Sequence, residues 1–425
     1  MLDLEANGTT VRTELIAGLT TYLTMVYIAF VNPTILAAAG MDKGAVFVAT
    51  CLAAAFGSAF MGLWANYPVA LAPGMGLNAY FAYSVVKGLG VTWQTALGAV
   101  FLSGVLFFLV SVTPVREWVI NSISKSMKLA ISVGIGFFLA CIGLQAAGLI
   151  ASDPTTLVRL GDLKTPQVGV AVTAFLLMAA LEALKVRGAI LIGILAAYAA
   201  SLMLGLSVFG GIASMPPSIA PVLLQMDIPG ALSLGLTAIV FTFFFVVVFD
   251  NTGTLIGVAN AAGLMTPDGT LPRIGRALAV DSTAAMVGAA LGTSTTTSYI
   301  ESAAGVNAGG RTGLVAVTVA VLFLATLFLA PLAGSIPAFA TAPALIFVGC
   351  LMMSAAREIE YEDATEYVPA AVTILSMPLT YSIADGIAFG FITYAGMKVL
   401  AGRHGELSAA IAGLAALFIL KFAFL

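Results

Sequence analysis

Two carboxylates lie inside long apolar stretches of the chain, and their positions are the clearest indication of chemistry in the sequence. Asp250 follows the uncharged run 238–249, and Glu301 follows the Thr/Ser run 293–298. A charged side chain in membrane hydrocarbon costs at least about 2.5 kcal/mol, so a ligand, a proton or a polar partner must offset that cost. A carboxylate can carry a proton, and it can accept parallel hydrogen bonds from two adjacent N–H groups. Two structural alternatives stay open: Asp250 bonded to an opposed backbone, and Glu301 as an N-terminal helix cap.

Four further residues accompany these carboxylates. Asn78 follows Gly74 and Gly76, which let backbones approach closely, although a buried amide can equally form an ordinary bond between helices. Thr254 lies one helical turn after the first carboxylate, and Tyr299 lies two residues before the second. Asp281 is either a structural partner of the cytoplasmic helix end or a direct participant. Among several aromatic residues nearby, only Tyr299 is singled out as a contact for a flat ligand.

The composition defines the class of protein that must position these groups. Of 425 residues 60% are hydrophobic and 9% are charged, and the mean hydropathy is +1.08. Because so few charged side chains cannot cover the surface of a soluble protein of this size, the chain is predicted to be a polytopic membrane protein. A net charge of -3 disfavours nucleic-acid binding, and three scattered cysteines with one histidine make neither a disulfide framework nor a His/Cys metal site. The sequence also lacks a Ser/His or Cys/His pair for a membrane enzyme, and no cofactor is expected.

Apolar stretches long enough to cross the bilayer fall into two sets of seven. The first set covers 14–37, 44–64, 68–86, 92–113, 128–150, 166–184 and 188–206. The second set covers 232–260, 276–292, 294–305, 311–330, 338–356, 366–382 and 384–401. A further apolar tail at 407–424 either crosses the membrane or lies along it. The N-terminus carries no basic residue ahead of the first apolar stretch, so that stretch is predicted to stay as a transmembrane helix rather than a cleaved signal.

The basic residues predict the orientation of these spans. With the N-terminus in the cytoplasm, and with Lys421 of the apolar tail left out, twelve Lys and Arg residues face the cytoplasm and only Lys43, Lys87, Arg159 and Lys164 lie outside. This bias is the one expected when basic residues stay on the cytoplasmic side.

Seven spans per half place the two halves in opposite orientations, which predicts an inverted repeat. Residues 72–78 in the third span and 293–301 in the tenth are rich in Gly, Pro, Thr and Ser and are poor helix sequences. Interrupted segments at matching positions of two repeats indicate a binding site near the membrane midplane. Irregular backbone at that depth survives only where it is buried or lines a wet cavity.

Several ordered motifs extend this interpretation over nearly the whole chain. They read APGMGLNAYF (72–81), FDNTGTLIG (249–257), RALAVDS (276–282), SYIESAAGVNAGGRTG (298–313) and MPLTYSIADGIAFGFI (377–392). In these segments the chain resembles the azaguanine-type purine permeases, the branch of the nucleobase permease superfamily that carries adenine, guanine and hypoxanthine. The uracil and xanthine permeases share the fold.

The resemblance implies an all-α architecture of fourteen segments in a seven-plus-seven inverted repeat, with short extended strands in segments 3 and 10. It implies a core domain of segments 1–4 and 8–11 (14–113 and 232–330) and a gate domain of segments 5–7 and 12–14 (114–206 and 338–401). A homodimer through the gate domain is a further expectation that it carries.

The resemblance also implies roles for individual residues. Glu301 becomes the tenth-span carboxylate that binds the base, Asp250 the eighth-span acid, and Asn78 a third-span polar contact, while Tyr299 and Ile300 belong to the strand that faces the ligand. Thr254 is added to the substrate contacts. The implied mechanism is proton symport by alternating access, with Asp250, Glu301 and also Asp281 as candidates for proton coupling. No metal is required.

Three other functions stay open. A uracil/xanthine-type permease would have the same fold with another base. An anion transporter of that fold is disfavoured because a carboxylate occupies the predicted site and no basic residue is predicted at the midplane. A channel would need a continuous polar lining and would transport without coupling.

Short loops favour a prokaryotic inner membrane as the location.

Overall fold

The structure is a computed structural model that describes residues 4–5, 7–113, 123–233, 237–264 and 271–424. The predicted start of the gate domain, 114–122, and residues 234–236 of the predicted eighth span therefore lie outside the described residues. In the first half the helices are α1 (Val11–Met25), α2 (Ile28–Ala37), α3 (Lys43–Phe60), α4 (Met75–Ala79), α5 (Trp93–Ser111), α7 (Lys125–Ala146), α8 (Pro166–Ala183) and α9 (Ala189–Met203). Two π-helical stretches, η1 (Met61–Ala65) and η2 (Tyr80–Gly88), extend α3 and α4.

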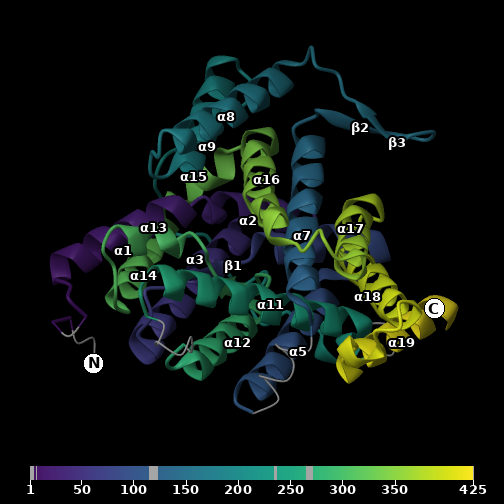
Figure 1. Cartoon of the computed structure of the whole chain (residues 1–425). Helices are drawn as coiled ribbons and strands as arrows, with labels where there is room; N and C mark the ends of the chain where they lie inside the picture. The colour runs from purple at the N-terminus through teal and green to yellow at the C-terminus, as the bar shows by residue number, and fades with distance from the viewer. Residues whose placement is uncertain (1–3, 6, 114–122, 234–236, 265–270, 425) are drawn as a thin grey trace.

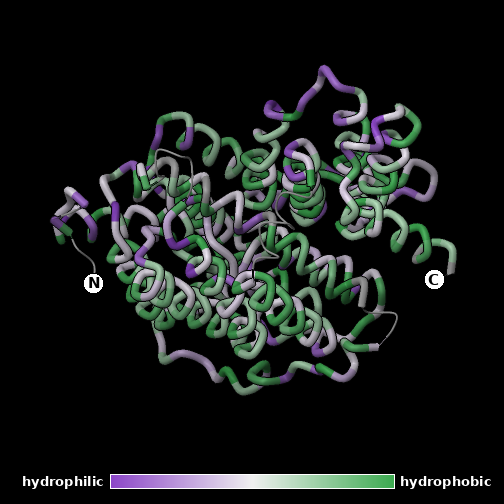
Figure 2. Tube along the Cα trace, turned by 60° about the horizontal axis from the view of Figure 1, so that its bottom comes forward, coloured by the Kyte–Doolittle hydropathy of each residue, from purple (hydrophilic) through white to green (hydrophobic). Residues whose placement is uncertain are grey.

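The second half repeats this mixture of long and short helices. Its helices are α10 (Ile228–Ala231), α11 (Thr237–Ala261), α12 (Ile274–Leu291), α13 (Ser302–Asn307), α14 (Leu314–Thr326), α15 (Ala330–Ser335), α16 (Ala338–Met353), α17 (Ala364–Leu379), α18 (Ile383–Leu400) and α19 (Ala409–Phe424). Short 3-10 turns are η3 (Leu327–Leu329), η4 (Ser354–Glu358) and η5 (His404–Glu406). Within the described ranges, ten helical stretches are long and apolar enough to cross a membrane. Figure 2 shows apolar residues along most helices and hydrophilic residues concentrated in many of the links.

The predicted fold class is confirmed: the chain is a helical, multi-pass membrane protein with short strands in segments 3 and 10. The strands are β1 (Leu71–Pro73) and β4 (Thr296–Ser298). The count of fourteen segments stays a prediction, because several of these segments are short helices or broken ones. Two residues, Val26 and Tyr27, separate α1 from α2 within the predicted first span. The apolar tail forms α19, which packs against α18 through stacked Phe391 and Phe418 rings.

A β-hairpin was not predicted. Strands β2 (Ile150–Asp153) and β3 (Leu157–Leu160) pair antiparallel after α7, and Figure 1 shows the hairpin extending away from the helices. Asp153 closes its turn, because its Oδ1 accepts hydrogen bonds from the backbone N–H groups of Thr155 and Thr156 at 2.8 and 3.1 Å.

Local sequence signals explain where many helices begin. Thr10, Asp42, Thr92 and Ser124 lie just before α1, α3, α5 and α7, and each side-chain oxygen accepts a hydrogen bond from a backbone N–H in the first turn. Such caps satisfy donors that have no partner inside the helix.

The helices pack in two groups that each combine both halves of the chain. In one group α3 contacts α2, α12 and α14, α1 contacts α13 and α14, and α5 contacts α11 and α12. In the other group α7 contacts α16, α17 and α18, and α8 and α9 contact each other and α16 (Figure 1). Contacts such as α4 with α7, α2 with α16 and α11 with α7 join the two groups. The two interrupted segments both belong to the first group.

Candidate functional site

The two interrupted segments meet as a short antiparallel pair of strands. Leu71 lies opposite Ser298, Ala72 opposite Thr297, and Pro73 opposite Thr296, and all six residues are buried. The pairing continues at both ends, through Gly74 N to Thr295 O and Tyr299 N to Ala70 O, each at 2.9 Å. Strands β1 and β4 thus satisfy each other's backbone groups, which makes extended backbone tolerable inside a membrane protein.

Side chains from neighbouring helices hold the rest of this backbone. Ser58 of α3 donates to Leu71 O at 3.1 Å and accepts from Leu71 N at 2.9 Å. Ser302 Oγ, at the start of α13, accepts from Ala70 N at 3.0 Å. Asn251 Oδ1 of α11 accepts from Ser298 N at 3.3 Å. The strand pair is therefore a rigid platform fixed by α3, α11 and α13.

Glu301 lies at one end of this platform, directly before α13. Its side chain is half-buried, and its Oε1 accepts a hydrogen bond of 2.8 Å from the hydroxyl of Tyr27. Glu301 directly precedes α13, so it occupies the N-terminal cap position named as an alternative for it. Its side chain, however, bonds to Tyr27, and no capping hydrogen bond from it to α13 is found.

Asp250 lies on α11, which contacts both β4 and α13. It is half-buried and close enough to Glu301 for their charges to interact. Because α11 is continuous through this region, Thr254 lies one turn further along the same helix, also half-buried. The structure therefore brings together the two carboxylates that are 51 positions apart in the sequence (301 − 250).

Asn78 lies on α4, one turn after the end of β1, rather than on the strand itself. Its side chain is fully buried, and neither Oδ1 nor Nδ2 has a hydrogen-bond partner among the described residues. A buried amide with both ends unsatisfied costs about 1–3 kcal/mol, so it is a strong candidate for contact with a polar ligand or water.

Asp281 lies on α12, which packs against strand β4 of the platform. Its carboxylate is fully buried on α12, and Oδ1 accepts a 2.7 Å hydrogen bond from the hydroxyl of Ser298, while Oδ2 is without a partner in the part of the chain described. Asp281 therefore lies beside β4 and within electrostatic range of Asp250. This position links it to the site rather than only to the N-terminal end of its helix.

Tyr299 and Ile300 follow β4 instead of belonging to it. Tyr299 is buried, and its hydroxyl donates to Pro73 O at 2.6 Å, so it ties the end of β4 to the end of β1. Ile300 is 55% exposed and is the one apolar side chain of this turn that faces outward.

Two residues that support the site were missed in the sequence. Tyr27 was not singled out among the aromatic residues near these segments, yet its hydroxyl contacts Glu301 across 274 positions. Glu14, on the first turn of α1, was placed at a span end, yet it is fully buried and accepts hydrogen bonds from the backbone N–H groups of Arg311 and Thr312 at 2.8 and 3.1 Å. No local pattern identifies partners so distant in sequence, although a carboxylate within an apolar span was a usable signal for Glu14.

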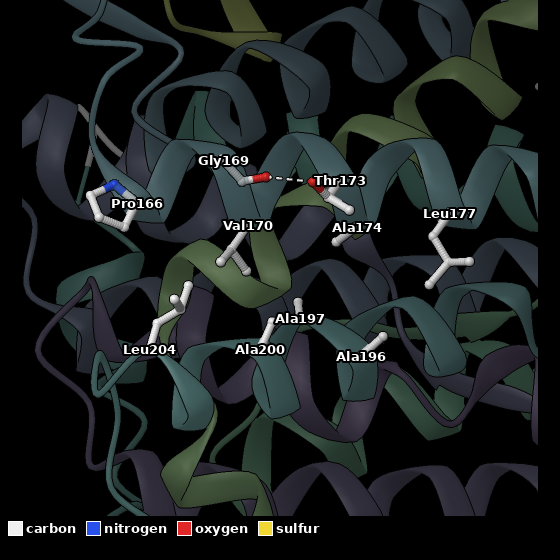
Figure 3. A pocket seen from close by; sticks show the side chains of 10 residues that line it. All are labelled: Pro166, Gly169, Val170, Thr173, Ala174, Leu177, Ala196, Ala197, Ala200 and Leu204. Atoms are coloured by element: carbon white, nitrogen blue, oxygen red, sulfur yellow. Dashed lines mark hydrogen bonds between the residues drawn. The ribbon is translucent and has the colours of Figure 1, made fainter.

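A groove of about 370 Å³ lies elsewhere, between α8 and α9 (Figure 3). It is lined by small and apolar residues such as Gly169, Ala174 and Ala197. The hydroxyl of Thr173 bonds to Gly169 O at 2.8 Å, as the dashed line shows, so it is engaged within its own helix. None of the candidate site residues lines this groove.

The site at the platform thus offers hydrogen-bond acceptors from two carboxylates, an unsatisfied amide and a buried aromatic side chain.

The fold around it is that of a membrane transporter. The transmembrane domain of the bicarbonate transporter BicA from a cyanobacterium superposes with a TM-score of 0.67 at 15% identity, covering 88% of this chain and 96% of that one. The anion transporter Slc26a9 of the mouse, in its inward-facing state, superposes with a TM-score of 0.64 at 12% identity, over 91% of this chain and 69% of that one.

Sequence comparison gives the family. Residues 12–389 match the model described as the permease family, the xanthine/uracil type, and the chain belongs to this family. The adenine permease AdeP of Escherichia coli is 48% identical over 425 residues, covering 100% of this chain and 96% of that permease. The guanine/hypoxanthine permease PbuO of Bacillus subtilis is 45% identical over 431 residues, covering 99% of each. The resemblance read from the motifs is therefore confirmed, and the protein is a transporter rather than an enzyme.

Proposed function

We propose that the protein imports purine nucleobases, namely adenine, guanine or hypoxanthine, by proton symport. The observation that carries this proposal is the pair of half-buried carboxylates, Asp250 and Glu301, beside a platform made from both halves of the chain. Relatives that cover the whole chain and are named as adenine and guanine/hypoxanthine permeases support it.

The proposed chemistry follows from the edge of a purine. Adjacent ring and exocyclic N–H groups form a donor pair, and a carboxylate accepts such a pair through its two oxygens. We assign this contact to Glu301, with Asp250 as the second acid and Asn78 as an amide that completes the polar contacts. Tyr299, Ile300 and Thr254 are the remaining proposed substrate contacts.

Proton coupling is assigned to the same acids. Asp250 and Glu301 repel each other when both are ionised, and protonation of one of them removes this repulsion. We assign base binding to the state in which one acid is protonated and the other is ionised. Asp281 is a third candidate, since it lies within electrostatic range of Asp250 and has one oxygen free of partners among the described residues.

Transport is proposed to follow alternating access between two domains. The core domain comprises α1 to α5 with α11 to α14, and the gate domain comprises α7 to α9 with α16 to α18. Movement of one against the other would carry the platform and its bound base across the membrane. We further propose that the N-terminus is cytoplasmic in a prokaryotic inner membrane and that two gate domains pair in a homodimer.

An anion is a poorer candidate substrate, although BicA transports one and shares the fold. A fold does not fix a substrate, and the carboxylates of Asp250 and Glu301 would repel an anion at this platform.

Calorimetric titration of the purified protein with adenine, guanine, hypoxanthine and uracil tests the substrate class. Saturable binding of at least one purine, tighter than binding of uracil, is the expected result. Binding of uracil alone would move the protein to the pyrimidine-type permeases, and tight binding of bicarbonate would overturn the proposal.

A further inference from the structure

We propose that Tyr27 is a positioning residue of the substrate site, whose hydroxyl holds the Glu301 carboxylate in the orientation that receives the base. This inference rests on the proposed function, because it takes Glu301 as the group that binds the purine. Nothing in the motifs assigns this role to Tyr27.

The break between α1 and α2 places the tyrosine. Around residues 26 and 27 the backbone tightens into i to i+3 hydrogen bonds, from Ala29 N to Val26 O and from Phe30 N to Tyr27 O, both at 3.0 Å. The Tyr27 side chain is 1% exposed, and its hydroxyl reaches Glu301 Oε1 at 2.8 Å. A tyrosine buried this deeply needs a partner for its hydroxyl, and here the partner is the carboxylate itself.

The short helix α13 cannot hold Glu301 in place alone. It has six residues, and α1 supports it along its length. In the middle, Gly305 lies so close to α1 that a Cβ atom there would come within 2.6 Å of Ala17 O. Just beyond its far end, Glu14 of α1 binds the backbone of Arg311. Helix α1 therefore holds α13 in place, and Tyr27, just after the end of α1, fixes the Glu301 side chain.

The side chain of Arg311 completes this support. Its Nη1 donates to Val306 O at 2.8 Å and to Gly310 O at 2.7 Å, which satisfies carbonyl groups at the C-terminal end of α13. The backbone behind Glu301 is thus held at both ends, so the remaining freedom at Glu301 is that of its side-chain torsions.

Acceptor counting shows how Tyr27 and the base can share one carboxylate. An ionised carboxylate has about four acceptor positions on its two oxygens. Tyr27 occupies one position on Oε1, which leaves Oε2 and the second position of Oε1 for two N–H donors. The hydroxyl therefore removes rotameric freedom from Glu301 before the base arrives, and preorganisation of this kind lowers the cost of binding.

The chain supplies a matched control on α1, close to Tyr27. Tyr22 lies five residues earlier on α1, and its hydroxyl forms a 2.6 Å hydrogen bond with the hydroxyl of Thr326 on α14. Tyr22→Phe and Tyr27→Phe each remove one hydrogen-bonded hydroxyl, but only the second removes a contact with Glu301.

The experiment measures purine Kd by calorimetry, and KM and maximal rate of uptake in proteoliposomes, for wild type and both variants. Tyr27→Phe is expected to raise Kd and KM about tenfold, as expected for loss of a hydrogen bond to a charged group. The maximal rate should change less than twofold, and Tyr22→Phe should leave Kd within twofold of wild type. If Tyr27→Phe does not fold, 4-fluorophenylalanine at position 27 fills the same volume without an O–H donor and serves in its place.

Two results would overturn the inference: an unchanged Kd when the Tyr27 hydroxyl is removed, or an equal loss of affinity in Tyr22→Phe. A wild type that binds none of the three purines is a separate result, because it contradicts the proposed function itself.

Discussion

The hydroxyl of Ser298 donates a 2.7 Å hydrogen bond to the buried carboxylate of Asp281, and so joins the short strand β4 to helix α12. Both side chains are buried, and the backbone N–H of Ser298 is held by Asn251 of α11. One serine therefore ties the platform to the two helices that carry Asp250 and Asp281.

Removal of this serine hydroxyl should loosen the platform. Ser298→Ala leaves Asp281 buried without this donor, and loss of a hydrogen bond to a charged group costs about 1–3 kcal/mol. We expect a lower unfolding temperature in detergent and weaker purine binding. Ser282→Ala is the matched control, because that buried hydroxyl bonds Ala279 O within its own helix. Equal stability losses in the two variants would contradict the linking role of Ser298.

Glu301→Gln tests the carboxylate that is proposed to bind the base. The amide keeps the size of the side chain, but it replaces one acceptor oxygen with a donor group that faces the N–H groups of the purine. Purine binding should weaken at least about 100-fold, since a paired charged contact is replaced by a mismatched one. Glu182→Gln, at an exposed site near the end of α8, should bind as wild type does. Uptake by Glu301→Gln at the wild-type rate and KM would rule out the assigned role.

Lys398 offers a test of the C-terminal end of α18. Its ammonium group is almost fully buried and lies 2.9 Å from Glu366 Oε1 and 2.6 Å from Glu406 Oε2. Lys398→Met leaves the buried Glu366 uncompensated, and we expect a loss of about 3 kcal/mol in stability. Lys125→Met removes an exposed pair with Glu358 and should cost less than about 1 kcal/mol.

A second substitution makes the Lys398 test specific. Adding Glu366→Gln to Lys398→Met should recover much of the lost stability, because the unpaired buried charge is then removed. Thermal unfolding in detergent gives both values, and a double variant less stable than Lys398→Met would argue against a charge effect.

Acid pH should weaken the N-terminus of α17 through Asp363. Hydrogen bonds from Thr365 hold the pKa of Asp363 down, with a smaller effect from Arg403, to about 2. A carboxyl with a lowered pKa stabilises the folded protein above its ordinary pKa of about 4, and that contribution disappears as pH falls toward 2. The unfolding temperature of wild type should therefore exceed that of Asp363→Asn at pH 6, and the difference should shrink below pH 4. A difference independent of pH would contradict this account.

Much of the fold could be predicted because its signals are local. Apolar runs of the length of a membrane span predicted the positions of the helices, and the Pro, Gly and Thr residues of 72–78 and 293–301 predicted interruptions in two of them. The family resemblance then implied short strands at these interruptions. The exact strands, 71–73 and 296–298, are set by their mutual pairing, so Asn78 lies on a helix and Tyr299 follows a strand. The hairpin at 150–160 was not predicted, because nearly all of its residues lie in the link between the predicted spans 128–150 and 166–184.

The site could be predicted only in part, for a related reason. Asp250 and Glu301 stand out because a carboxylate inside an apolar span is costly wherever its partners lie. Tyr27 carries no such signal, since tyrosine is tolerated in membrane helices and its partner lies 274 positions away. The pairing of Asp281 with Ser298 also depends on the packing of α12 against β4, which no single stretch of sequence encodes.

Uptake of radiolabelled hypoxanthine, adenine and guanine into liposomes containing the purified protein tests the central claim most directly. An inward proton gradient should accelerate uptake of at least one base, and an excess of the unlabelled bases should block it. The same liposomes with Glu301→Gln should take up no more base than empty ones. Uptake that is indifferent to the proton gradient would contradict proton symport, and no uptake of any purine by folded protein would contradict purine transport.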